Sequence, residues 1–137
     1  DEPVGKFGVN AHVVVAETQA EAMEYAHGMV DGWLGFFAKI AAARDASAGE
    51  DDPTYSEHGT FTDMVASWTF DELLEHNVIL FGDVDQVVEQ TQRMRDSGID
   101  MLTGWFQFGD LDYEFANRSL RLFCEEVIPR VETKTLA

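Results

Sequence analysis

Three short apolar runs, each followed by a capped helical pattern, constrain this sequence more than any other feature. The runs cover residues 7–16, 77–82 and 100–107, and β-branched and aromatic residues are common in them. Strands that alternate with helices form parallel sheets with right-handed crossovers. The sequence therefore predicts an α/β fold with a three-stranded parallel sheet and long helices packed outside it.

The first run alternates between two faces of a strand. One face carries Val9, Ala11, Val13 and Val15, and the other carries Gly8, Asn10, His12 and Val14. Two roles suit His12: a hydrogen-bonded structural histidine, which we favour, or a proton shuttle.

Helices are expected after each strand. Thr18 and Glu21 form a capping-box pair before residues 19–45, and Asp83 is placed to cap residues 84–98. The last helix, within residues 110–131, is expected to bury a stripe of Phe115, Leu120, Phe123, Cys124 and Val127. We expect Cys124 to be a buried, inert thiol. As the single cysteine it rules out an internal disulfide, which fits the cytoplasm.

The segment 45–60, "DASAGEDDPTYSEHGT", is polar, acidic and rich in helix breakers. Little apolar material is available to anchor it, so a mobile loop is predicted.

The charge of the chain limits its partners. With 26 acidic and 9 basic residues, the formal net charge is -17, so nucleic acid and anionic membrane surfaces are not expected partners. The histidines are scattered without ligand spacing, so no metal site is expected. No nucleophile or nucleotide motif is present, so the catalytic residues are unknown.

The second half of the chain resembles the C-terminal end of the bacterial luciferase-like, flavin-dependent monooxygenases. The resemblance rests on a strand ending in Gly82 and Asp83, a helix with "VVEQ", the motif "DSGID", and "RSLRLFCEEVIPRV". Upstream, "VNAHVVVAETQAEAMEYA" is similar to the preceding strand and helix of that family.

The resemblance implies a fold and a chemistry. Members of the family are (β/α)8 TIM barrels, so residues 1–137 would form one partial barrel of about three βα units. They bind reduced FMN, or a deazaflavin in one branch, receive it from a flavin reductase, and use dioxygen to oxidise small organic substrates. The resemblance also implies a lid over the flavin, at the position of residues 45–66.

One strand end has the composition of a binding surface. In "TGWFQFGD", residues 103–110, Trp105 and Phe106 are suited to wall a flat ring, and Gln107 to bind its edge. Gly82 closes the middle strand, where a helix N-terminus can hold phosphate, although the Asp83 cap favours plain capping there. The candidate cofactor-binding residues are thus Trp105, Phe106, Gln107 and Gly82.

The chain begins at "DEPVGKFGVN" without an initiator Met, which suggests a piece of a longer protein. Three strands have two free edges, and "NAHVVVA" and "MLTGWF" carry almost no charge. For the chain alone we therefore expect a homodimer, no monooxygenase activity and no retained FMN. The alternatives are a non-catalytic self-associating module and a flavin-binding protein without chemistry.

Overall fold

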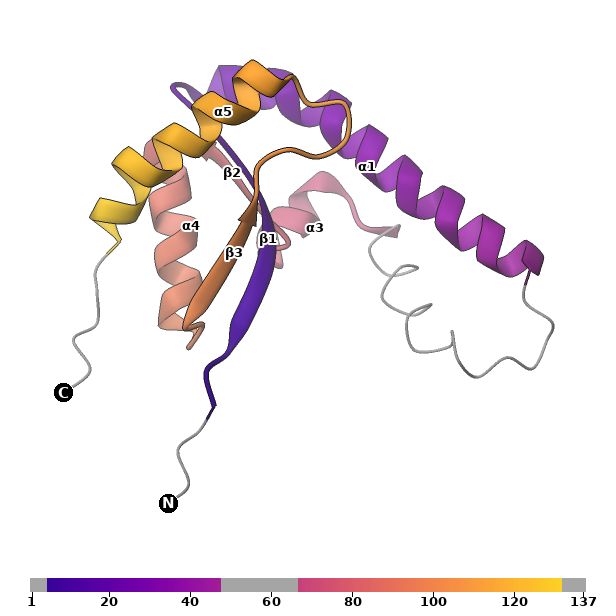
Figure 1. Cartoon of the computed structure of the whole chain (residues 1–137), viewed down its shortest axis with the longest axis horizontal. Helices are drawn as coiled ribbons and strands as arrows, with labels where there is room; N and C mark the ends of the chain where they lie inside the picture. The colour runs from indigo at the N-terminus through magenta and orange to yellow at the C-terminus, as the bar shows by residue number, and fades with distance from the viewer. Residues whose placement is uncertain (1–4, 48–66, 132–137) are drawn as a thin grey trace.

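The fold of the chain was analysed in a computed structural model, which describes residues 5–47 and 67–131 (Figure 1). The main elements are β1 (Gly8–Ala16), α1 (Gln19–Ser47), α3 (Phe70–Glu75), β2 (Ile79–Asp83), α4 (Val84–Asp96), β3 (Met101–Trp105) and α5 (Tyr113–Leu122). Residues 45–47 form the end of α1, and the rest of the expected mobile loop, 48–60, lies outside the described residues. Among the described helices, none is long and apolar enough to cross a membrane.

The three strands form one parallel sheet in the order β2-β1-β3. The carboxyl-terminal half of β1 pairs with β2, with Ala16 opposite Asp83, and the amino-terminal half pairs with β3, with His12 opposite Trp105. The predicted α/β class, the parallel pairing and the three strand positions are confirmed. Because β3 pairs only with the amino-terminal half of β1, its last residue, Trp105, lies beside the middle of β1.

Each face of β1 packs into a separate core. Val13 and Val15 lie in one core, against α4 and the end of the chain's last helix. Val14 and Ala16 lie in the other, against α1, α3 and the start of α5. The predicted alternation of β1 is therefore correct, and helices cover both faces of the sheet (Figure 1).

The capping residues of two helices are well formed. Asp83 Oδ1 accepts the Gln86 N–H, and Gln86 Oε1 accepts the Asp83 N–H, each over 3.0 Å. Thr69 and Glu72 make the same reciprocal pair at α3. These side chains satisfy N–H groups that have no partner inside a helix, so each box fixes where its helix begins.

The last helix buries a different stripe from the expected one. Its buried line is Phe115, Ser119, Phe123 and Val127, spaced by four residues, whereas Leu120 is 41% exposed and Cys124 is exposed. A spacing of four is wider than the 3.6 residues of an α-helical turn. The helix widens into a π turn over Phe123–Val127 and so keeps this line on the sheet. The prediction that Cys124 is buried was therefore wrong.

Two helix side chains complete hydrogen bonds where strand pairing stops. Beyond the end of β3, the Val15 N–H of β1 donates to Ser119 Oγ over 2.8 Å. On the outer edge of β2, Gln90 of α4 binds both main-chain groups of Phe81: its Oε1 accepts the N–H and its Nε2 donates to the C=O, each over 2.8 Å. The Gln90 amide thus takes the place of a neighbouring strand.

Replacing Ser119 with Ala should destabilise the fold. Ser119 is fully buried, so the Val15 N–H would lose its acceptor where water cannot replace it. A buried group left unpaired costs about 1–3 kcal/mol, and we expect the free energy of unfolding to fall by that amount. Urea titration of S119A measures it, with N117A on the exposed side of α5 as the control. Equal midpoints for the two variants would contradict the role of Ser119.

Candidate functional site

Four rings gather on the face of the sheet that α1 crosses, and we name them the His12 cluster: His12, Trp33, Trp105 and Phe108. The centre of the His12 ring lies 4.6 Å from that of Trp33, 5.2 Å from Trp105 and 4.4 Å from Phe108. Interplanar angles of 63° to 68° make all three contacts edge-to-face. This is a favourable geometry for aromatic pairs, so the three rings form the walls around His12.

Separate elements bring these residues together. His12 lies in the middle of β1, and the strand register sets Trp105 opposite it. Phe108 follows β3 in the loop before α5, and Trp33 comes from the middle of α1. The sequence gave no sign that Trp33 contacts His12, because that contact depends on the path of α1 over the sheet.

The imidazole of His12 is neutral at physiological pH. Its burial lowers the pKa from the usual 6.5 to about 4, because desolvation disfavours the charged form. Its Nε2 is buried and has no hydrogen-bond partner within the described residues. Buried polar atoms in folded proteins nearly always have a partner, so this nitrogen is available to a group that the described residues do not supply.

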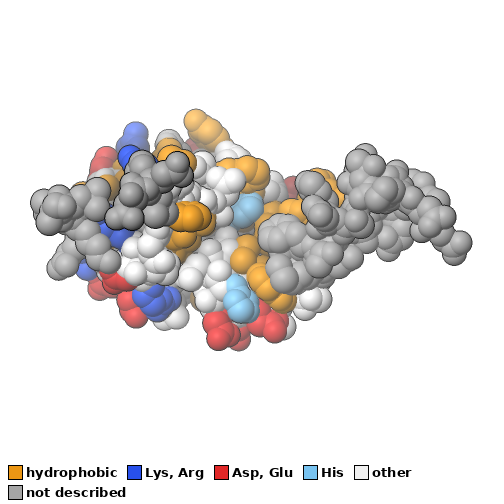
Figure 2. Space-filling view, turned by 90° about the horizontal axis from the view of Figure 1, so that it is seen from below, with side chains coloured by type: hydrophobic (Ala, Val, Ile, Leu, Met, Phe, Trp, Pro, Cys, Tyr) orange, Lys and Arg blue, Asp and Glu red, His pale blue; other side chains and the backbone are white. Residues whose placement is uncertain are grey.

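The surface around the cluster combines exposed and buried apolar groups. Trp105 is 53% exposed although it contacts His12, whereas Phe108 is buried. Seen from below, hydrophobic side chains gather beside histidine, with acidic side chains along one edge (Figure 2). A site of this kind suits an uncharged, largely apolar ligand with one hydrogen-bonding atom.

The predicted site residues do not all meet. Trp105 belongs to the His12 cluster, but Phe106 lies on the opposite face of the sheet, 5.4 Å from the ring of Phe123. Gln107 is exposed and donates from Nε2 to the Leu111 C=O over 3.0 Å, which holds the loop. Trp105 is therefore the one predicted residue that joins His12.

Gly82 is explained by the helix cap beside it. Its φ of 144° lies in a region that side chains disfavour, and a Cβ there would collide with the Gln86 side chain. Because Gln86 is the reciprocal partner of Asp83 in the capping box, glycine is needed for the cap itself. A cofactor contact at Gly82 stays a prediction.

The side chains of the His12 cluster suit the ring system of FMN better than its phosphate. Aromatic walls and a neutral hydrogen-bonding nitrogen suit a flat ring system, while the phosphate needs positive charge or free N–H groups. The Asp83 carboxylate caps the helix start after β2, so that helix N-terminus does not favour an anion.

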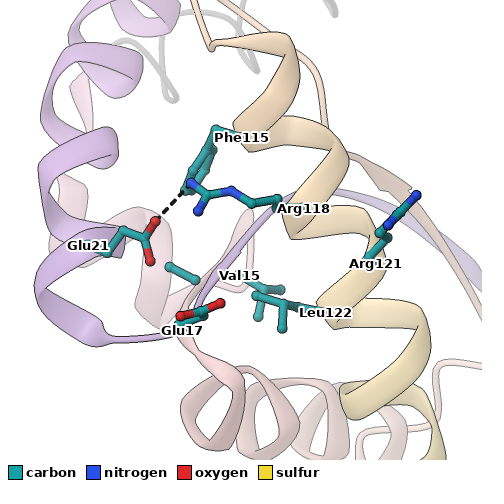
Figure 3. Close-up of a pocket in the computed structure, with 8 residues that line it drawn as sticks. Val15, Glu17, Glu21, Phe115, Arg118, Arg121 and Leu122 are labelled. Atoms are coloured by element: carbon teal, nitrogen blue, oxygen red, sulfur yellow. Dashed lines mark hydrogen bonds and ion pairs between the residues drawn. The ribbon is translucent and has the colours of Figure 1, made fainter.

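A cavity of about 130 Å³ lies apart from the His12 cluster, between the end of β1, the start of α1 and α5 (Figure 3). Arg118 and Glu21 form an ion pair across it, with Nη2 and Oε1 2.9 Å apart, and the guanidinium carbon lies 5.6 Å from the Phe115 ring centre. Arg121 points away from it (Figure 3). Because Arg118 is already paired, this cavity is best explained as the contact that joins α1 to α5.

Metal chemistry finds no support among the described residues. No group of three His, Cys, Asp or Glu side chains in this part of the chain could hold a metal ion.

Comparison with known proteins identifies the fold through structure alone. No family model matches the sequence. No curated protein matches it either. Among solved structures, the chain is similar to the monooxygenase RslO1 from Streptomyces bottropensis, at 20% identity and a TM-score of 0.56, over 96% of this chain and 33% of that one.

A second similar structure is a Type II Baeyer-Villiger enzyme, the oxygenating constituent of 3,6-diketocamphane monooxygenase from the CAM plasmid of Pseudomonas putida, in complex with FMN. The identity is 20% and the TM-score 0.52, over 93% of this chain and 34% of that one. This chain thus spans about a third of the length of each. It has the fold of one part of these monooxygenases, an α/β partial (β/α)8 barrel built from three βα units, although its strand order, β2-β1-β3, differs from the consecutive order of a closed barrel.

Proposed function

We propose that this chain is the C-terminal part of a luciferase-like, FMN-dependent monooxygenase, in which the His12 cluster forms one wall of the site for flavin and substrate. The observation that carries the proposal is the coincidence of two features. The fold is similar to that of two monooxygenases, one of them in complex with FMN, and the same chain holds an aromatic cluster around a neutral, unpartnered His12 nitrogen.

The roles of the residues follow from their environment. Reduced flavin supplies the electrons that activate dioxygen, with one oxygen atom going to the substrate and the other to water. Trp105 and Trp33 exclude water from one side of the site, and His12 Nε2 makes a hydrogen bond to an uncharged group of the ligand. Suitable substrates are small aldehydes, alkanes or ketones, with a flavin reductase as partner and the cytoplasm as location.

The chain by itself should be inactive and should not retain FMN. Three strand ends provide only part of a pocket, and the helix start after β2, where a phosphate could bind, is capped by the Asp83 carboxylate. A deazaflavin is the second choice of cofactor, and it would need the same aromatic wall.

A non-catalytic role is the alternative proposal. Phe7, Met101 and Trp105 are each more than half exposed on or beside β1 and β3, which suits a module that associates through its sheet.

An oxygenation assay separates these proposals. The chain would be produced alone and in continuity with the coding sequence upstream of Asp1, then supplied with FMN, a flavin reductase, NADH and a panel of ketones and aldehydes. We expect oxygenated product, detected by mass spectrometry with ¹⁸O₂, from the longer protein only. Upstream sequence without further βα units, or a longer protein that forms no product with any flavin, would overturn the proposal.

A further inference from the structure

The two edges of the sheet are not equivalent. In the β1–β2 ladder the His12 N–H donates to the Val78 C=O, so alternate residues of β2 face β1 and Phe81 faces outward. Gln90 binds both outward groups of Phe81. The edge of β2 is therefore closed at its centre by a side chain of the same molecule, which discourages pairing with another strand.

The edge of β3 has no such closure among the described residues. The Met101 N–H donates to the Phe7 C=O, so Met101, Thr103 and Trp105 direct their main-chain groups to β1. Leu102 and Gly104 then direct theirs outward, and the structure shows no side chain bound to them. This strand, "MLTGW", carries no charge in a chain whose net charge is -17.

An open, uncharged edge on a strongly acidic molecule favours a particular partner. With a net charge of -17, two copies repel each other on average, whereas the β3 strand itself places no charge at the contact when two β3 edges meet. The residues beside this edge are also apolar: Met101 is 61% exposed and Trp105 is 53% exposed.

We propose that two copies of this chain join antiparallel along their β3 edges, about a two-fold axis at Thr103, to form a continuous six-stranded sheet. Antiparallel pairing about Thr103 sets Leu102 of one copy opposite Gly104 of the second. These residues are the ones with outward main-chain groups, so each pair exchanges two hydrogen bonds. The dimer contains two such Leu102–Gly104 pairs, which together form four hydrogen bonds. These satisfy all the outward main-chain groups of both residues in both copies.

The same register matches the side chains. Met101 and Trp105 lie two residues on either side of Thr103. Antiparallel pairing about Thr103 therefore places Met101 of each copy opposite Trp105 of the other. Both side chains lie on the face of His12, and opposite residues at such positions have closely spaced side chains. A methionine thioether against an aromatic ring is a favourable contact. The two exposed apolar side chains of β3, Met101 and Trp105, thus cover each other in a single self-complementary arrangement.

Substitution at the axis tests the interface. In T103E two carboxylates would face each other across the axis, and Thr103 is exposed, so the single chain should still fold. We expect sedimentation velocity from about 1 to 100 μM to show dimers of the unchanged chain. T103E should be mainly monomeric, because its dimer dissociation constant should be at least ten times higher. N117E makes the same charge change on α5 and should leave the dimer intact. A monomeric unchanged chain, or a T103E dimer of equal strength, would refute the proposal.

Cross-linking fixes the register independently. Opposite residues at this kind of position have Cα atoms about 4.5 Å apart, within the range that a disulfide spans. In a Cys124→Ser background, T103C should form a disulfide-linked dimer almost completely under mild oxidation, whereas N117C should not. A dimer that T103C fails to link would overturn the two-fold axis at Thr103. This inference concerns the chain alone, so a lost dimer leaves the oxygenation proposal standing, and absent oxygenation leaves the dimer standing.

Discussion

Replacing His12 with Phe is expected to stabilise the chain. The Nε2 atom is buried without a partner in the described structure, and an unsatisfied buried group costs about 1–3 kcal/mol. Phe keeps a ring between Trp33, Trp105 and Phe108 and removes the polar atom. We therefore expect H12F to raise the free energy of unfolding by about 1 kcal/mol at pH 7, since the slightly larger ring offsets part of the gain.

The effect should grow as the pH falls. The folded pKa of about 4 lies below the usual 6.5, so between these values the unfolded chain binds a proton that the folded chain does not. Stability is thus unaffected above pH 6.5 and decreases toward pH 4. The pKa difference corresponds to roughly 3 kcal/mol, and the partial exposure of the ring reduces the expected loss to about 1–2 kcal/mol.

Urea titrations at several pH values from 4.5 to 7.5 measure this difference between H12F and the unchanged chain. H76F is the matched control, because His76 is exposed and stacks on Trp68 at 4.6 Å. Its free energy of unfolding at pH 7 should stay within about 0.5 kcal/mol of that of the unchanged chain. A less stable H12F at pH 7 would show that the imidazole contributes to folding, which would remove the reason to assign it a ligand.

Replacing Gln90 with Ala is expected both to weaken the fold and to change the assembly. The Phe81 N–H and C=O would lose their partners on a strand that is almost wholly buried. Two such losses, partly relieved by water at the edge, should lower the free energy of unfolding by about 2–4 kcal/mol. E89A is the control on the same helix, where Glu89 makes only an exposed ion pair with Arg93 and the change should stay within about 1 kcal/mol.

Opening the edge of β2 should also permit further pairing. A dimer joined through β3 still has two outer β2 edges, and unpaired main-chain groups there form a template for another strand. At concentrations where the unchanged chain stops at a dimer, light scattering should detect larger species of Q90A. In the combined Q90A and T103E chain the β3 edge is blocked, so any association should proceed through the opened β2 edge and stop at a dimer. A Q90A chain of unchanged stability and size would contradict the closure of this edge.

Local pattern was enough to predict most of the fold. The β-branched run of β1 has both faces in contact with a core, and its alternation indicated which residues lie on each. The Asp83 cap was predicted from its place between the strand and the helix, and the structure adds Gln86 as its reciprocal partner. Cys124 was misplaced because the pattern was compared with a 3.6-residue repeat, whereas the π turn over Phe123–Val127 holds a repeat of four.

The local sequence pattern did not predict the order of the strands in the sheet. In a closed barrel consecutive strands are neighbours, which would set β2 between β1 and β3, but here β1 is central. Apolar residues alone do not distinguish these orders, because β1 is buried on both faces either way. The site depends on this order: Trp105 was singled out by its composition, while its meeting with His12 follows from the β1–β3 register.

The measurement that tests the account most directly is a fluorescence titration of FMN against two proteins, the 137-residue chain and the chain extended by the coding sequence upstream of Asp1. Bound flavin changes its own emission and quenches nearby tryptophan, so binding beside Trp33 and Trp105 is visible from both partners. We expect saturable, one-to-one binding by the extended protein, weakened at least tenfold by H12F, and no saturation by the 137-residue chain. Stoichiometric FMN binding by the 137-residue chain, or an extended protein that binds no flavin, would contradict it.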